Sequence, residues 1–193
     1  MPEIPEIALT DGCLRIDGDV FEFDAVTSVA YVKNIFRATQ TTTHVRRRFE
    51  IELADSRRLV DLDGARVKAE EKQTAWANLV AISQQAIEPR LREKALARLR
   101  SGETVSVGRL ELRRSGFAWR GPFRQKEFPW SAHGRTIYAV GRIKVIVSSP
   151  RRNDKTVVDL GTDVPNAVLL PKLMVACAKE FGPQPAGREA NSA

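Results

Sequence analysis

Short runs of alternating apolar and polar residues fill two long stretches of the chain, and each stretch leads into a segment with helical spacing. The alternation is clearest at residues 48–54, where Phe49, Ile51 and Leu53 are separated by glutamates. A period of two predicts an antiparallel strand with one face against the core and the other in water. Asp-Gly pairs near residues 12 and 18 predict tight turns between the first strands. The first stretch is therefore expected to be a series of hairpins.

The spacing of apolar residues changes to three and four at residues 70–100, which contain no glycine and one proline. This pattern predicts a long amphipathic helix, kinked or ended near Pro89 and stopped by Gly102. A second helix is predicted at about 165–181. The basic, apolar-striped segment 91–100 fits either a helix on a membrane surface or a helix packed between domains. Its short length favours packing.

The same succession of short motifs occurs twice, at an offset of about 96 residues. Leu14-Arg15-Ile16 corresponds to Leu110-Glu111-Leu112, and Leu59-Val60-Asp61-Leu62 corresponds to Val157-Val158-Asp159-Leu160. Each copy is long enough to close its own core, so the repeat predicts tandem domains and not a solenoid. We expect one unit at 1–102, a second at 103–182, and a disordered tail at 183–193.

Several segments resemble bacterial members of the pleckstrin-homology-like family. They are the strand-turn-strand opening 9–16, the Pro-Trp segment 126–131 with its loose counterpart 23–29, and Trp76 on the first helix. The resemblance implies an α+β fold of two consecutive units, each a bent antiparallel β-barrel or sandwich followed by a C-terminal α-helix. It also implies a binding module and not an enzyme, although the fold alone does not name a ligand.

Charge is distributed unevenly along the 193 residues, whose formal net charge is +7. Residues 1–102 hold 16 basic and 16 acidic side chains, so the excess lies entirely in residues 103–193. An acidic partner is therefore expected to prefer the second unit. The alternative is that arginine is a common surface residue here, since the Arg and Ala content is typical of a bacterial protein.

Motifs for catalysis are missing from the sequence. His44 and His133 have no Cys, Asp or Glu at metal-ligand spacing, and no nucleophile motif or phosphate-binding loop occurs. We therefore expect no enzymatic activity, no metal site and no cofactor.

A basic cluster with interleaved aromatic residues is the one candidate site. It runs from Leu112 to Lys126 without an acidic residue, and in the family a basic hairpin of this kind binds inositol phosphates. Its candidate anion-binding residues are Arg113, Arg114, Arg120, Arg124 and Lys126. Arginine pairs with phosphate through two parallel hydrogen bonds, but the pattern favours a solvated basic hairpin over an anion site, since Phe117 and Trp119 share the face expected to be the core. Secondary candidates are Arg46, Arg47, Arg48, Arg151 and Arg152.

Three partners remain open at this stage. A protein partner, in a binding or scaffolding role, requires no further motif. Peripheral binding of anionic lipid headgroups and binding of nucleic acid would both use the basic cluster. The acidic, proline-broken start predicts no signal peptide and hence a cytoplasmic protein, which the lipid alternative places at the inner membrane face.

Overall fold

A computed structural model describes residues 6–10, 12–37, 43–62, 68–121, 124–149 and 152–183. Side chains 34–37, 43–44, 149 and 152–153 lie outside the description, as do the predicted tail from residue 184 onward and Arg151. The described part is α+β with antiparallel sheets, which confirms the predicted class.

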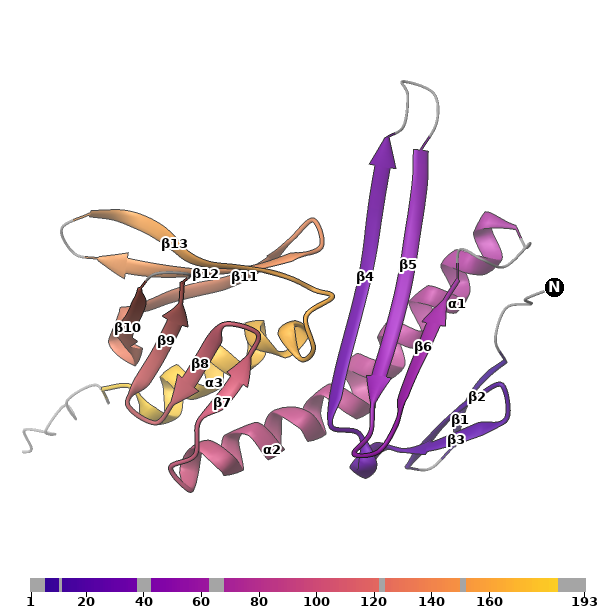
Figure 1. The fold of residues 1–193 in the computed structure, drawn as a ribbon, viewed down its shortest axis with the longest axis horizontal. Helices are drawn as coiled ribbons and strands as arrows, with labels where there is room; N and C mark the ends of the chain where they lie inside the picture. The colour runs from indigo at the N-terminus through magenta and orange to yellow at the C-terminus, as the bar shows by residue number, and fades with distance from the viewer. Residues whose placement is uncertain are drawn as a thin grey trace, which may run out of the picture.

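Six N-terminal strands form two three-stranded meanders (Figure 1). They are β1 (Ile7–Thr10), β2 (Cys13–Ile16), β3 (Asp19–Glu22), β4 (Ser28–Arg37), β5 (Thr43–Glu52) and β6 (Arg57–Asp61). A 3-10 turn, η1 (Phe23–Ala25), separates β3 from β4. The alternating segment 48–54 lies in β5, where Phe49 and Ile51 are buried as predicted.

Seven C-terminal strands repeat this order with one strand more. They are β7 (Val105–Val107), β8 (Leu110–Arg113), β9 (Gly116–Arg120), β10 (Gln125–Pro129), β11 (His133–Ala139), β12 (Arg142–Ser149) and β13 (Arg152–Gly161). The first four form one sheet and the last three another, with the 3-10 turn η3 (Trp130–Ala132) between them. In the described residues all four sheets of the chain are open, and none closes into a barrel.

One continuous helix follows the N-terminal strands and extends to the C-terminal strands (Figure 1). It consists of α1 (Ala69–Ile82), a π-helical segment η2 (Ser83–Ile87) and α2 (Glu88–Arg100). Pro89 lies in the first turn of α2, directly after the π segment, because its missing N–H and its ring interrupt the regular hydrogen bonding there. The predicted disturbance at Pro89 is therefore a change of helix type within a helix that continues.

The C-terminus of α2 agrees with the sequence prediction. Gly102 has φ +88°, and its N–H donates to the carbonyl of Leu99 at 3.1 Å. The N–H of Glu103 donates to the carbonyl of Arg98 at 2.9 Å, which completes a Schellman motif. The last helix, α3 (Leu170–Phe181), follows the 3-10 turn η4 (Ala167–Leu169) and ends before Gly182.

Buried apolar side chains form two clusters. The first includes Leu14, Phe49 and Leu79, and the second includes Phe117 and Leu173. The division falls within α2, because Leu91 belongs to the first cluster and Ala95, Leu96 and Leu99 belong to the second. The helix therefore joins both cores. The domain boundary at residue 102 stays a prediction.

The C-terminal part of the chain also packs directly against the N-terminal strands. Asn166, with φ +63°, donates its backbone N–H to the carbonyl of Val29 at 2.8 Å. Its side-chain oxygen accepts the N–H of Val29 at 3.1 Å, and its amide donates to the carbonyl of Thr27 at 3.3 Å. Val168 and Leu169, which follow in η4, belong to the first core cluster. These contacts fix the two strand sets relative to each other.

Candidate functional site

The basic cluster predicted from the sequence lies on the sheet β7–β10, but the register divides its members. Glu111 is opposite Ala118, Arg113 is opposite Gly116, and Ala118 is opposite Glu127. Because side chains alternate across a sheet, Arg113 and Arg120 share one face with Glu111 and Glu127. Phe117 and Trp119 point to the other face, toward the second core.

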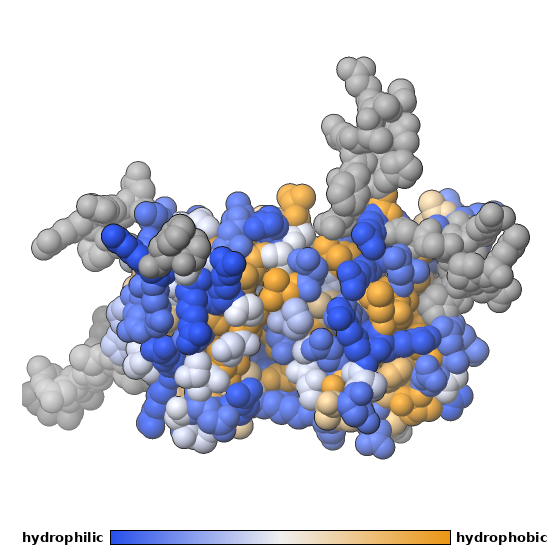
Figure 2. Space-filling view, in the orientation of Figure 1, coloured by the Kyte–Doolittle hydropathy of each residue, from blue (hydrophilic) through white to orange (hydrophobic). Residues whose placement is uncertain are grey.

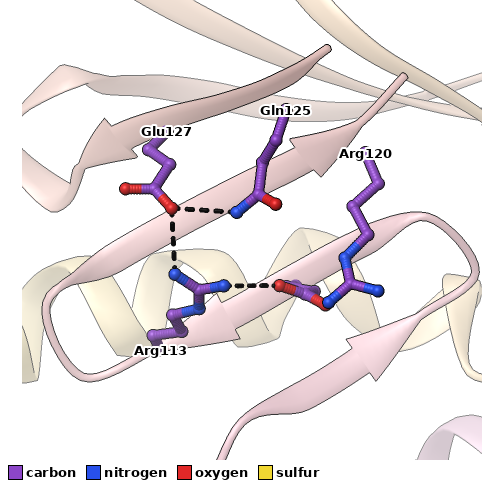
Figure 3. A network of polar contacts seen from close by, with 5 residues as sticks. Arg113, Arg120, Gln125 and Glu127 are labelled. Carbon is purple, nitrogen blue, oxygen red and sulfur yellow. Dashed lines mark hydrogen bonds and ion pairs between the residues drawn. The ribbon is translucent and has the colours of Figure 1, made fainter. Parts of the chain in front are cut away.

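Two of the five candidate residues are paired with carboxylates (Figure 3). Arg113 contacts Glu111 at 2.7 Å and Glu127 at 3.0 Å, and Arg120 forms an ion pair with the same Glu111. The side chain of Glu111 is 8% exposed, so the two guanidinium groups neutralise a nearly buried charge. The hydrogen bond that Arg113 donates to Glu111 raises the pKa of its guanidinium group. Arg113 and Arg120 therefore already have anionic partners within the protein.

The other three candidates are exposed and lie apart from this network. Arg114 is in the β8–β9 turn, and Arg124 precedes β10. Lys126 is opposite Trp119 in the ladder, so it starts from the opposite face of the sheet. The structure therefore brings together two of the five basic residues and adds two acidic ones. The turn itself is fixed by Trp130, whose indole N–H donates to the carbonyls of Arg113 and Arg114 at 3.1 and 3.2 Å.

The secondary arginines are also separated. On β5, Arg46 pairs with Asp61 at 3.7 Å and Arg48 pairs with Glu50 at 3.3 Å. Arg47, on the opposite face, is buried and donates to the side chain of Gln73 at 3.3 Å. Arg152 begins β13, with its side chain outside the description.

The β11–β12 hairpin carries an exposed apolar group that the sequence reasoning missed. Ala139 pairs with Arg142, which leaves Val140 and Gly141 as a two-residue turn with φ values of +48° and +72°. Val140 is 95% exposed, and Ile137 and Tyr138 are exposed beside it on β11. A positive φ at both positions is the type I′ turn, for which Asn-Gly is preferred and a β-branched residue is strained. The sequence signal was a valine at a position where hairpins usually have asparagine.

Figure 2 shows apolar side chains reaching the surface between the two sets of strands. A pocket of about 340 Å³ lies at this junction, lined by residues of β4, of the helix from α1 to α2, of β11–β12 and of α3. Tyr31, Trp76 and Tyr138 line it together with the buried carboxyl of Glu88. We call this cavity the junction pocket. Nothing in local sequence patterns indicates it, because its walls come from both halves of the chain.

The described ranges contain neither a metal-binding cluster nor a helix that could span a membrane. No group of three or more His, Cys, Asp or Glu side chains is arranged to hold a metal ion. No helix in these ranges combines the length and the apolar character that crossing a membrane requires. His133, half-buried, contacts the hydroxyl of Thr136 at 2.9 Å, and burial lowers the pKa of its ring.

Comparison of the chain with family models, with curated proteins and with solved structures finds no match.

Proposed function

We propose that this chain is a non-catalytic binding module of two pleckstrin-homology-like units that docks a protein partner through the β11–β12 hairpin. The order of elements supports the proposal. A meander, a 3-10 turn, a three-stranded meander and a helix occur in that order twice. The strand-and-helix succession is the one that the resemblance implies, and the fourth strand of the second copy, β10, contains most of the Pro-Trp segment.

The observation that carries the proposal is the exposed and strained Val140. A valine in the left-handed region costs about 1–2 kcal/mol relative to a residue that tolerates it. Its side chain recovers nothing from packing, because it is 95% exposed. A folded protein that keeps such a residue at a hairpin tip, beside exposed Ile137 and Tyr138, presents an apolar anchor. Anchors of this kind fill pockets on protein partners.

The pairing of the basic cluster favours a protein partner over an anionic one. Arg113 and Arg120 are already bound to Glu111, so an incoming phosphate would have to displace a nearly buried carboxylate. Such a displacement leaves that carboxylate without its partners at a cost of several kcal/mol. Peripheral lipid binding and nucleic-acid binding, the two alternatives, would have to displace this carboxylate or use only the exposed Arg114, Arg124 and Lys126.

The test starts with a photo-crosslinking amino acid placed at position 140 in cells. The captured protein is identified by mass spectrometry, purified, and titrated against three forms of this chain. These forms are the wild type, V140N, and the control L59N, which changes another exposed apolar residue on β6. We expect V140N to weaken the complex at least about tenfold, the loss typical of an interface anchor, and L59N to leave it within about twofold.

Equal affinity of V140N and the wild type for every captured protein would refute docking through the hairpin. Vesicles with anionic phospholipid and a short duplex DNA are titrated in parallel at low salt. Salt-sensitive binding to either, abolished by R113E together with R120E, would replace the proposal with the corresponding alternative. Because V140N is expected to be more stable than the wild type, its loss of binding could not be explained by unfolding.

A further inference from the structure

The junction pocket has the size and position of a small-molecule site. Its volume is about 340 Å³, within the usual range for ligand pockets, and it lies between two packed parts of one chain. One wall comes from β4 and the long helix, and the other comes from the β11–β12 hairpin and α3. Asn166 bonds to β4 and Leu169 packs in the first core, so the walls are held together without a ligand. The pocket is preformed.

A buried carboxyl group faces this pocket. Glu88 is 5% exposed, and its Oε1 accepts hydrogen bonds from the hydroxyls of Tyr31 at 3.0 Å and Ser83 at 3.2 Å. Within the described part of the chain its second oxygen, Oε2, accepts no hydrogen bond, while the residue lines the cavity. The buried side-chain atoms that lack a partner in the described ranges do not include this oxygen, so it retains access to the cavity and can contact a bound molecule there. Glu88 also follows the π-helical segment, a feature frequent at functional sites.

Two lysines and two further aromatic rings also line the junction pocket. Lys33 on β4 and Lys172 on α3 approach from opposite walls. Lys33 donates to the neutral side chain of Gln73 at 3.0 Å, and in the described ranges neither ammonium group forms an ion pair. Trp76 and Tyr138 add two rings from the two walls. Two cations against one buried carboxyl group leave the pocket with a positive charge, which favours an anion.

We propose that the junction pocket binds a small organic anion with a flat apolar body. The anionic group lies between Lys33 and Lys172, the flat body packs against Trp76 and Tyr138, and Glu88 makes the polar contact at the closed end. A cationic ligand does not fit, since it would lie against two ammonium groups. An inorganic ion does not fit either, because it leaves the aromatic and aliphatic walls without a partner.

The probe for the test is 1-anilinonaphthalene-8-sulfonate, an aromatic anion that fluoresces when its surroundings become apolar. Its uncharged relative N-phenyl-1-naphthylamine has the same rings without the sulfonate. We expect one saturable site for the sulfonate and at least about tenfold weaker binding of the uncharged probe, since charge-assisted contacts to two lysines are lost. The double variant K33Q/K172Q should weaken the sulfonate about tenfold and leave the uncharged probe unchanged.

The matched control is K155Q, which removes one exposed positive charge from β13, outside the pocket. It should change neither probe by more than about twofold. Cooperative thermal melting of every variant excludes binding to a partly unfolded state. Amide chemical-shift changes with 2-naphthoate, confined to β4, the helix from α1 to α2, the β11–β12 hairpin and the start of α3, provide a readout independent of fluorescence.

Equal affinity of the wild type for both probes would mean that the pocket does not recognise charge, and would overturn the proposal. Equal affinity of K33Q/K172Q and K155Q for the sulfonate would overturn it for the same reason. Absence of a saturable signal together with absence of 2-naphthoate shifts would overturn it as well. Neither result bears on docking of a protein through Val140, because these tests leave Val140 in place.

Discussion

Replacing Val140 with asparagine should make the protein more stable. The turn at Val140 and Gly141 has φ values of +48° and +72°. The same turn geometry occurs at Asp17 and Gly18, with φ values of +53° and +87°, where the first residue is one that tolerates this region. Since the valine is 95% exposed, its removal sacrifices almost no packing. The gain is thus set by the backbone penalty alone.

The size of the gain follows from that penalty. A β-branched residue in the left-handed region costs about 1–2 kcal/mol, and asparagine avoids much of it, so V140N should gain about 1 kcal/mol. For a chain of this length that free energy corresponds to a rise in melting temperature of about 2–4 °C. Thermal unfolding followed by circular dichroism, and urea unfolding analysed with a common slope, both measure it.

Two controls separate backbone strain from other effects. V140A retains a Cβ atom and should gain less than V140N, because alanine also disfavours a positive φ. V20N changes a valine that is 56% exposed on β3, in a strand, and should bring no gain. A melting temperature of V140N at or below that of the wild type would refute the reasoning, and with it the strain on which the proposed docking site is argued.

Two further predictions concern the junction between the strand sets. N166G retains the positive φ but loses the side-chain hydrogen bonds to Val29 and Thr27, so its free energy of unfolding should fall by about 1–3 kcal/mol. N166A loses the same bonds and also disfavours a positive φ, so its free energy of unfolding should fall further. Equal stability of N166G, N166A and the wild type would contradict a stabilising role for the Asn166 hydrogen bonds. Burial raises the pKa of Glu88 above its ordinary value, against smaller opposing effects of the hydrogen bonds from Tyr31 and Ser83 and of the charge of Lys172. Glu88 therefore binds a proton more tightly in the folded state, and the stability it contributes below pH 4.5 is lost as pH rises through the raised pKa. The free energy of unfolding of E88Q minus that of the wild type should therefore increase between pH 4.5 and the raised pKa of Glu88. A difference independent of pH would contradict a raised pKa for Glu88.

Local patterns in the sequence predicted the elements because local physics determines them. Alternation placed β5, the three-and-four spacing placed the long helix, and Gly102 ended it through the left-handed conformation that glycine adopts freely. The sign of φ at Val140, in contrast, is not visible in a hydrophobic pattern. It follows only from a pairing register that leaves two residues in the loop.

The candidate site was harder to predict because its chemistry depends on pairing between strands. The stretch from Leu112 to Lys126 contains no acid, yet Glu111 and Glu127 lie one residue beyond its two ends. Adjacent strands bring both of these acids to the arginine face of the sheet. The junction pocket was invisible for a similar reason. Which core an apolar residue such as Val168 joins is decided by contacts with residues more than a hundred positions away.

The positive φ of Val140 and the π-helical segment η2 both occur in elements that line the junction pocket, and neither occurs in the basic cluster. Three non-glycine residues of the described ranges have positive φ; Asp17 and Asn166 are of types that tolerate it, and Val140 is not. The π-helical segment η2 and the buried Glu88 adjoin the pocket into which Tyr138 of the same hairpin points. Strain of this kind is concentrated at functional sites in proteins, whereas Arg113 and Arg120 form ordinary ion pairs with Glu111. Mutations that impair binding without lowering stability should therefore fall at the hairpin and the pocket, and the sheet β7–β10 should tolerate exchange of an exposed charge outside the Glu111 network, such as Lys126.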